Sequence, residues 1–312
     1  MTPIFLFSLP RSGSTLLQRV LADRNEIDTA TEPWILLHLI YPLKTKSLVM
    51  EYSHNVAGIG LEDFIGGLRG GEEAYRSELA QFVLRLYGRS SRKTGAKYFL
   101  DKTPRYHLIL DEIIEMFPEG KFIFLWRNPL SVAASISNTW DAGHWNLYRF
   151  EIDMYRGINN LIVAYEKHRQ RCHAVRYEDL LSDSDAAWDS IFQYLNLPPT
   201  DGKININNVA VAGRLGDKMG VAAYDHLSRE PEEKWKQWVC NPLRKAWCYR
   251  YLNWLGSERI STMGYSMDEL LTQLNSLPIG LNVFASDAFR IVKGGARRLI
   301  FNKMLKYLSE RI

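Results

Sequence analysis

Short apolar runs alternate with longer amphipathic stretches along the first two thirds of this 312-residue chain. Runs bounded by Gly, Pro or polar residues predict buried strands, and apolar residues spaced three or four apart predict helices. The predicted strands are Ile4 to Ser8, Tyr98 to Leu100, Lys121 to Trp126 and Cys172 to Val175. The predicted helices are Ser14 to Ala22, Trp34 to Tyr41, Glu72 to Tyr87, Tyr106 to Phe117, Leu130 to Thr139, Glu151 to His168 and Trp188 to Leu195. This alternation predicts an α/β fold, a three-layer sandwich with a central parallel sheet.

The first predicted strand turns directly into the first helix. The turn carries, in order, Pro10, Arg11, Ser12, Gly13, Ser14 and Thr15. Unpaired backbone N–H groups at a helix start attract anions, and the arginine and hydroxyls add further donors. The loop therefore predicts a phosphate or sulfate site. The ATP-binding pattern G-x-x-x-x-G-K-[ST] is absent, because no lysine precedes Ser14.

A second anion site is predicted after the strand Lys121 to Trp126. Arg127 follows this strand directly, and Ser135 lies eight residues later in the next predicted helix. Open α/β sheets bind ligands beyond the carboxyl ends of their strands, so Arg127 is placed to grip a phosphate.

The residues Pro10 to Thr15 resemble the 5′-phosphosulfate loop of sulfotransferases, P-[KR]-[ST]-G-[ST]-[ST]. Arg127 and Ser135 match the spacing with which that family holds the 3′-phosphate of 3′-phosphoadenosine-5′-phosphosulfate (PAPS). The stretch Arg176 to Leu180 is similar to a secondary family mark, R-Y-E-[DE]-L, in which we expect Tyr177 to pack rather than touch substrate. The resemblance implies a P-loop nucleotide-kinase-like fold and PAPS as cosubstrate, without a metal.

Glu32 is the predicted catalytic base. Its interval from Arg11 resembles that of the catalytic glutamate in tyrosylprotein sulfotransferases. Lys102 matches the lysine that the family places near the transferring sulfonate. Cytosolic members continue with Thr-His and use the histidine as base, but here Pro104 stands in its place. His107 is the rival base, and an N-terminal helix carboxylate is the alternative role for Glu32.

Composition narrows the class of protein without identifying it. The chain is 46% hydrophobic and 24% charged, which suits a globular enzyme, and its net charge of +4 gives little support for nucleic-acid binding. The three cysteines show no disulfide or metal spacing. We find no secretory signal and no apolar run that spans a bilayer, and the chain starts with the loop strand. These features predict a cytoplasmic protein.

The chain is predicted to form a sulfotransferase domain over 1–275 and a basic amphipathic helical extension over 276–312. The extension could contact an anionic membrane, dock on its own domain or support a homodimer. A helical insertion over 45–97 is expected to wall the acceptor site. Aromatic and imidazole side chains that could face an acceptor, or equally pack in the core, are Trp140, His144, Trp145 and Tyr148. Arg214 and Lys218 lie in a basic loop that could close over the nucleotide.

Together these features predict a sulfotransferase that transfers the sulfuryl group of PAPS to an acceptor hydroxyl, most simply on a carbohydrate or glycolipid. A P-loop-type kinase of nucleotides or small molecules would share the fold, but the glycine-lysine loop is missing. A non-catalytic nucleotide-binding protein is the other alternative. Binding of adenosine 3′,5′-bisphosphate rather than ATP separates the first hypothesis from the second.

Overall fold

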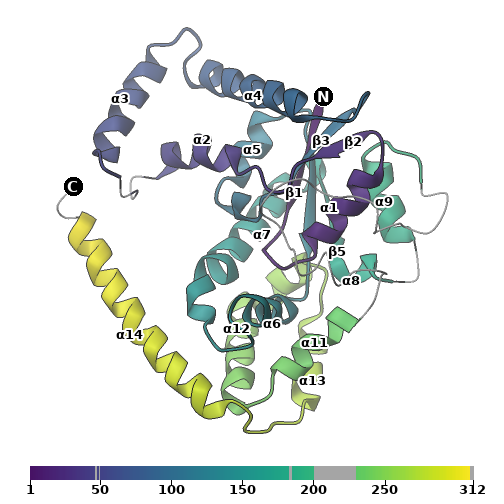
Figure 1. Cartoon of the computed structure of the whole chain (residues 1–312), viewed down its shortest axis with the longest axis vertical. Helices are drawn as coiled ribbons and strands as arrows, with labels where there is room; N and C mark the ends of the chain where they lie inside the picture. The colour runs from purple at the N-terminus through teal and green to yellow at the C-terminus, as the bar shows by residue number, and fades with distance from the viewer. Residues whose placement is uncertain (46–47, 49, 183–184, 200–229, 310–312) are drawn as a thin grey trace.

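A five-stranded parallel sheet forms the centre of the molecule, as a computed structural model shows (Figure 1). The structure describes residues 1–45, 48, 50–182, 185–199 and 230–309, without the side chains of 230–232 and 297–309. The strand order is β2-β3-β1-β4-β5. The strands are β1 (Thr2–Phe7), β2 (Ile27–Thr29), β3 (Tyr98–Asp101), β4 (Lys121–Trp126) and β5 (Cys172–Arg176). All four pairings are parallel, which confirms the predicted α/β fold.

Helices cover both faces of the sheet (Figure 1). The α-helices are α1 (Ser14–Asp23), α2 (Ile35–Lys44), α3 (His54–Gly66), α4 (Gly71–Ser90), α5 (Leu110–Met116), α6 (Pro129–Trp140), α7 (Ile158–His168), α8 (Tyr177–Leu180), α9 (Ala186–Tyr194), α11 (Glu230–Trp238), α12 (Pro242–Thr262), α13 (Met267–Ser276) and α14 (Phe284–Ser309). Short turns of other helical types are η1 (Pro104–Leu108), η2 (Leu147–Phe150), η3 (Ile152–Gly157) and η4 (Arg169–Arg171).

The strands are apolar on both faces, as strands covered by two helical layers must be. Along β1, Phe5 and Phe7 face one layer, and Ile4 and Leu6 face the other. The phenylalanine side carries a stack of rings together with Phe122, whose centroid lies 5.9 Å from that of Phe5. This layer includes α2, α5, α7 and α12, while α1 and α9 cover the opposite face.

Several predicted elements differ in detail. The expected helix from Tyr106 to Phe117 is divided at Ile109 into η1 and α5. The expected helix from Glu151 to His168 begins with the wide turn η3 before α7. Gly58 and Gly60 lie inside α3, where glycine is tolerated at a modest cost in stability.

The carboxyl-terminal segment forms α14, which begins at Phe284. Its first turns are anchored to the domain, because the buried Asp287 carboxylate accepts from Arg244 Nε at 2.7 Å. Beyond this anchor, Phe289 and Val292 are exposed. Of the helices that the structure describes, not one combines the length and apolar character needed to cross a membrane. Arg214 and Lys218 lie outside the described residues.

Candidate active site

Four neighbouring strands each deliver one charged residue just beyond their carboxyl ends. Along the sheet the order is Glu32 after β2, Lys102 after β3, Arg11 after β1 and Arg127 after β4. The strands are parallel, so their carboxyl ends share one edge of the sheet. This is the edge at which open α/β sheets bind ligands. The excess of cations over carboxylates suits an anionic ligand.

The structure brings Arg11, Arg127 and Ser135 into direct contact. The Arg127 guanidinium donates through Nη1 to the Arg11 carbonyl at 2.7 Å, and Arg11 Nε donates to Ser135 Oγ at 3.3 Å. Arg11 also adopts a φ of 66°, which few residues other than glycine take up. Backbone strain of this kind concentrates at ligand sites, where the surroundings hold it. The residues of the two predicted anion sites are therefore in contact with one another.

The phosphate-type loop fits closely against the sheet. Gly13 has a φ of 88° and caps the start of α1, so the first amides of that helix face the loop. A Cβ at this position would lie 2.1 Å from Cδ2 of Tyr177. The Tyr177 ring is fully buried and also stacks under the Arg127 guanidinium, 4.5 Å from its centroid. Tyr177 therefore packs, as expected, and it supports both anion-binding elements.

Ser12, Ser14 and Thr15 complete the predicted loop. The residues Ser12 and Ser14 are buried, while Thr15 at the start of α1 is half-buried. A helix start of this kind favours negative charge through its exposed N–H groups and its dipole. The loop therefore combines a helix start, hydroxyl groups and the Arg11 cation, which are the groups that a phosphate or sulfate site uses.

Glu32 and Lys102 form an ion pair with a distance of 2.7 Å between Oε1 and Nζ. The Lys102 side chain is 2% exposed and the Glu32 side chain 14%. The second oxygen of Glu32 accepts from the indole of Trp34 at 3.3 Å. The pair lies at the same sheet edge as Arg11, and its carboxylate retains contact with solvent. Part of the Glu32 side chain is therefore accessible to solvent.

Buried hydrogen bonds fix the segment that carries Lys102. The preceding Asp101 is fully buried and accepts from Tyr87 at 2.6 Å, Tyr106 at 2.9 Å and Thr103 at 3.1 Å. Burial raises the pKa of Asp101 to about 6, although these hydrogen bonds and the Lys102 charge act in the opposite direction. This cluster is not apparent from the sequence, because no short motif links Tyr87 of α4 to Asp101 and their contact depends on how α4 packs against the sheet.

Gln18 is a second supporting residue that sequence reasoning missed. From α1 its amide nitrogen donates to Thr29 Oγ1 at 2.8 Å, to the Ala30 carbonyl at 2.7 Å and to the Thr31 carbonyl at 3.1 Å. These bonds fasten the segment that leads to Glu32 onto the helix that follows the phosphate-type loop. The available signal was a polar residue directly after the apolar pair Leu16 and Leu17 of α1.

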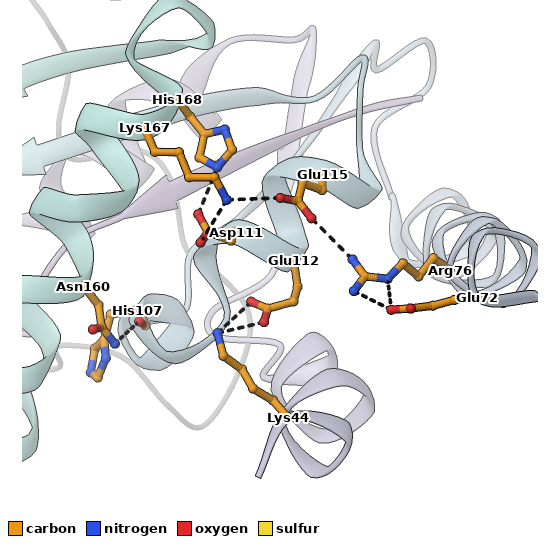
Figure 2. A network of polar contacts seen from close by, with 10 residues as sticks. All are labelled: Lys44, Glu72, Arg76, His107, Asp111, Glu112, Glu115, Asn160, Lys167 and His168. Atoms are coloured by element: carbon orange, nitrogen blue, oxygen red, sulfur yellow. Dashed lines mark hydrogen bonds and ion pairs between the residues drawn. The ribbon is translucent and has the colours of Figure 1, made fainter. Parts of the chain in front are cut away.

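The polar contacts of His107 are made with the helical layer. Its side chain is buried, and Nε2 lies 3.2 Å from an oxygen of the buried Asp153, which also pairs with Arg105 at 2.7 Å. The His107 carbonyl accepts from Asn160 at 2.9 Å, a contact drawn in Figure 2. These contacts link η1 to α7 and η3, so they hold the helical layer together.

The aromatic residues considered as acceptor contacts have packing partners. Trp145 is buried and stacks on Trp238 with 5.6 Å between ring centroids. Trp140 is exposed but lies against Phe150, 5.0 Å away. The backbone carbonyl of His144 accepts from Ser137 at 2.8 Å, and Gly294 of α14 approaches the ring of Tyr148.

Comparison with known proteins identifies the family of the chain. The model of the sulfotransferase family matches residues 3–201, more than half of the chain and the part that carries the four strand-end residues. The structure resembles a sulfotransferase domain from the curacin biosynthetic pathway, with a TM-score of 0.51 and 20% identity over 85% of this chain and 98% of that one. At this identity the likeness shows the fold alone.

Curated relatives match shorter stretches. The chain is 32% identical over 136 residues to nodulation protein NoeE of Sinorhizobium fredii, covering 44% of this chain and 31% of that protein. It is 25% identical over 211 residues to a protein-tyrosine sulfotransferase of Drosophila melanogaster, covering 65% of this chain and 39% of that protein. The chain thus matches well under half the length of these two relatives.

Proposed function

Because this chain belongs to the sulfotransferase family, we propose that it transfers the sulfuryl group of PAPS to a hydroxyl of an acceptor. The observation that carries the proposal is the row of Glu32, Lys102, Arg11 and Arg127 beyond four adjacent parallel strands. The acceptor class that we propose is a carbohydrate or a glycolipid.

The loop and the second arginine have separate tasks in this proposal. The backbone amides of residues Ser12 to Thr15, with Arg11, hold the 5′-phosphosulfate, and Arg127 with Ser135 holds the 3′-phosphate. The fit rests on the cradle at Gly13, where the chain approaches so closely that a side chain has no space, and on the direct contacts among Arg11, Arg127 and Ser135. When bound, PAPS supplies the sulfuryl group and leaves as adenosine 3′,5′-bisphosphate.

Glu32 acts as the base in this scheme. It receives the proton of the acceptor hydroxyl while the acceptor oxygen forms its bond to sulfur and the bond from sulfur to the bridging phosphate oxygen breaks. Lys102 Nζ orients Glu32 and, with its remaining N–H donors, stabilises negative charge on the transferring group. Arg11 does the same for charge on the leaving phosphate. Positioning and charge stabilisation account for most of the catalysis in such group transfers.

Geometry favours Glu32 over His107 as the base. The Glu32 carboxylate contacts Lys102 Nζ and the Trp34 indole at the sheet edge and remains partly exposed to solvent. The Nε2 atom of His107 faces Asp153 inside the helical layer, and its side chain is buried. A general base must come within hydrogen-bond reach of the proton that it removes. His107 would require a rearrangement of that layer.

A transfer assay tests the proposal. The purified chain is incubated with PAPS radiolabelled on sulfur and with separate pools of glycans, glycolipids, phenols, tyrosine peptides and aliphatic alcohols. We expect label in one pool, with adenosine 3′,5′-bisphosphate released in equal amount, and no label with Glu32→Gln. Transfer of phosphate from ATP under the same conditions, or full activity of Glu32→Gln, contradicts the proposal.

A further inference from the structure

A large cavity lies away from the sheet edge, between α2, α3, α4 and α5. Its volume is about 760 Å³, within the range of sites that hold small-molecule ligands. Figure 1 shows α3 and α4 standing out from the body that contains the sheet, with α2 and α5 nearer to it. The apolar residues of the lining include Ile40, Leu43, Ile59, Ile65, Leu79 and Met116. The cavity is therefore mainly a hydrocarbon surface.

The charged groups that line the cavity do not favour binding of an anion. Lys44 pairs with Glu112 at 2.7 Å, and Arg76 pairs with Glu72 at 2.7 Å (Figure 2). The lining also contains Glu62, so its carboxylates outnumber its lysine and arginine side chains. A phosphate or carboxylate would have to displace these carboxylates from the two cations. The lining therefore favours an uncharged, apolar occupant.

Apolar side chains of the lining remain in contact with water. Leu43 is 44% exposed and Ile59 is 57% exposed, although both line the cavity. Covering such surface with hydrocarbon is favourable, and contiguous exposed apolar surface marks binding sites. An aliphatic chain would cover both side chains at once.

One helix connects this cavity to the candidate base. Helix α2 begins three residues after Glu32, and its second half forms part of the cavity wall. Ile40 lies five residues beyond Ile35, which is about 7.5 Å along the axis. The cavity wall and the candidate base therefore lie at opposite ends of one short helix.

We propose that the cavity holds an aliphatic chain of the acceptor while the hydroxyl of the same molecule faces Glu32. The acceptor is then a lipid-like alcohol or a glycolipid rather than a free sugar or a peptide. This inference rests on the proposed function for the identity of the reacting group. Occupation of the cavity, however, can be measured without any transfer.

Two glycines of α3 provide a matched pair of variants. Gly58 lines the cavity and Gly60 does not. A Cβ at either position meets nothing within 4 Å, and neither residue has a positive φ. Gly58→Phe therefore fills part of the cavity, whereas Gly60→Phe adds the same ring to the same helix outside the lining.

The experiment is equilibrium dialysis of radiolabelled dodecanol against the parent protein, Gly58→Phe and Gly60→Phe, with butanol as the short-chain comparison. We expect the parent and Gly60→Phe to bind dodecanol equally, and Gly58→Phe to bind it at least about tenfold more weakly. Butanol should bind far more weakly than dodecanol to the parent. Equal binding of adenosine 3′,5′-bisphosphate by all three proteins would show that the fold is intact.

Equal dodecanol binding by Gly58→Phe and Gly60→Phe, or no binding by the parent, overturns the inference. A parent protein that is dimeric, binds no dodecanol and becomes monomeric with Gly58→Phe would instead make the cavity an interface between copies. Dodecanol binding with the expected variant pattern, but without transfer from PAPS to any acceptor, would uphold the cavity assignment and overturn the proposed function.

Discussion

Gly13 and Tyr177 pack so closely that a Cβ on Gly13 would lie 2.1 Å from Cδ2 of the tyrosine ring. The two residues join the phosphate-type loop to α8, the short helix that follows β5. The same ring also lies against the Arg127 guanidinium. The position of Tyr177 therefore affects both the Gly13 loop and Arg127, the two predicted phosphate-binding elements. Gly13 is therefore required for its lack of a side chain as well as for its backbone angle.

We expect Gly13→Ala to lower both stability and nucleotide affinity. Its φ of 88° costs a non-glycine residue about 1–2 kcal/mol, and the overlap with Tyr177 adds about 1–3 kcal/mol. Urea unfolding and calorimetry with adenosine 3′,5′-bisphosphate measure the two effects. Gly60→Ala, in an open helical position, should be neutral or slightly stabilising. Equal unfolding free energies for Gly13→Ala and the parent would refute the close contact.

The Glu32–Lys102 pair should behave as one unit in a double-mutant cycle. Lys102→Met leaves Glu32 without its cation, and Glu32→Gln leaves the Lys102 charge buried beside a neutral amide. Because Glu32 keeps some exposure, we expect each change to cost about 2–3 kcal/mol of unfolding free energy, less than for a fully buried pair. The double variant should cost less than the sum, by about 1 kcal/mol or more. Strict additivity would mean that the pair does not form in solution.

Catalysis should separate Glu32 from His107. We expect Glu32→Gln to lower kcat by roughly 10²–10⁴-fold, as loss of a general base does, while binding of adenosine 3′,5′-bisphosphate stays close to that of the parent. His107→Asn should lower the unfolding free energy, since it disturbs the contact with Asp153, but leave kcat near the parent value. The opposite pattern, with kcat lost in His107→Asn and kept in Glu32→Gln, would make the histidine the base.

Asp101 gives a pH dependence with a definite sign. Burial raises its pKa from 3.8 to about 6, so the folded protein keeps this proton over a range in which the unfolded chain has lost it. The contribution of Asp101 to the unfolding free energy should therefore fall as the pH rises from about 4 to about 6, by about 3 kcal/mol in total.

The matched variant for this measurement is Asp101→Asn, which cannot titrate. Between pH 4 and pH 6 the unfolding free energy of the parent should fall relative to that of Asp101→Asn. Tyr87→Phe removes a hydrogen bond that favours the charged carboxylate, so the fall should extend to higher pH. If the unfolding free energies of the parent and Asp101→Asn differ by a constant amount between pH 4 and pH 6, the raised pKa of Asp101 is contradicted.

Much of the sheet could be predicted because its strands are short, apolar and separated by helical periodicity. The order β2-β3-β1-β4-β5 was not predicted, because strand order depends on contacts distant in sequence. The three residues of β2 carry too little periodicity to mark a strand clearly. Helices broken at Ile109 or begun by η3 were read as continuous because their apolar spacing continues across the break.

The grouping of candidate site residues could be predicted where a short motif follows a strand. Arg11, Gly13 and Arg127 each stand at a strand end that the sequence marks, and the structure joins them. Gln18, Asp101 and Tyr87 were missed because each supports the site through partners on other elements. The cavity between α2 and α5 was missed for the same reason: its walls come from four helices whose packing is set by tertiary structure.

The most direct measurement of the central claim is a calorimetric comparison of adenosine 3′,5′-bisphosphate, AMP and ATP as ligands of the unaltered chain. If Arg127 and Ser135 hold a 3′-phosphate beside the Arg11 loop, the bisphosphate should bind at least about a hundredfold more tightly than AMP, because AMP lacks the group that makes the charged hydrogen bonds. ATP should also bind more weakly than the bisphosphate. Equal affinity for AMP and the bisphosphate, or a preference for ATP, would contradict the account.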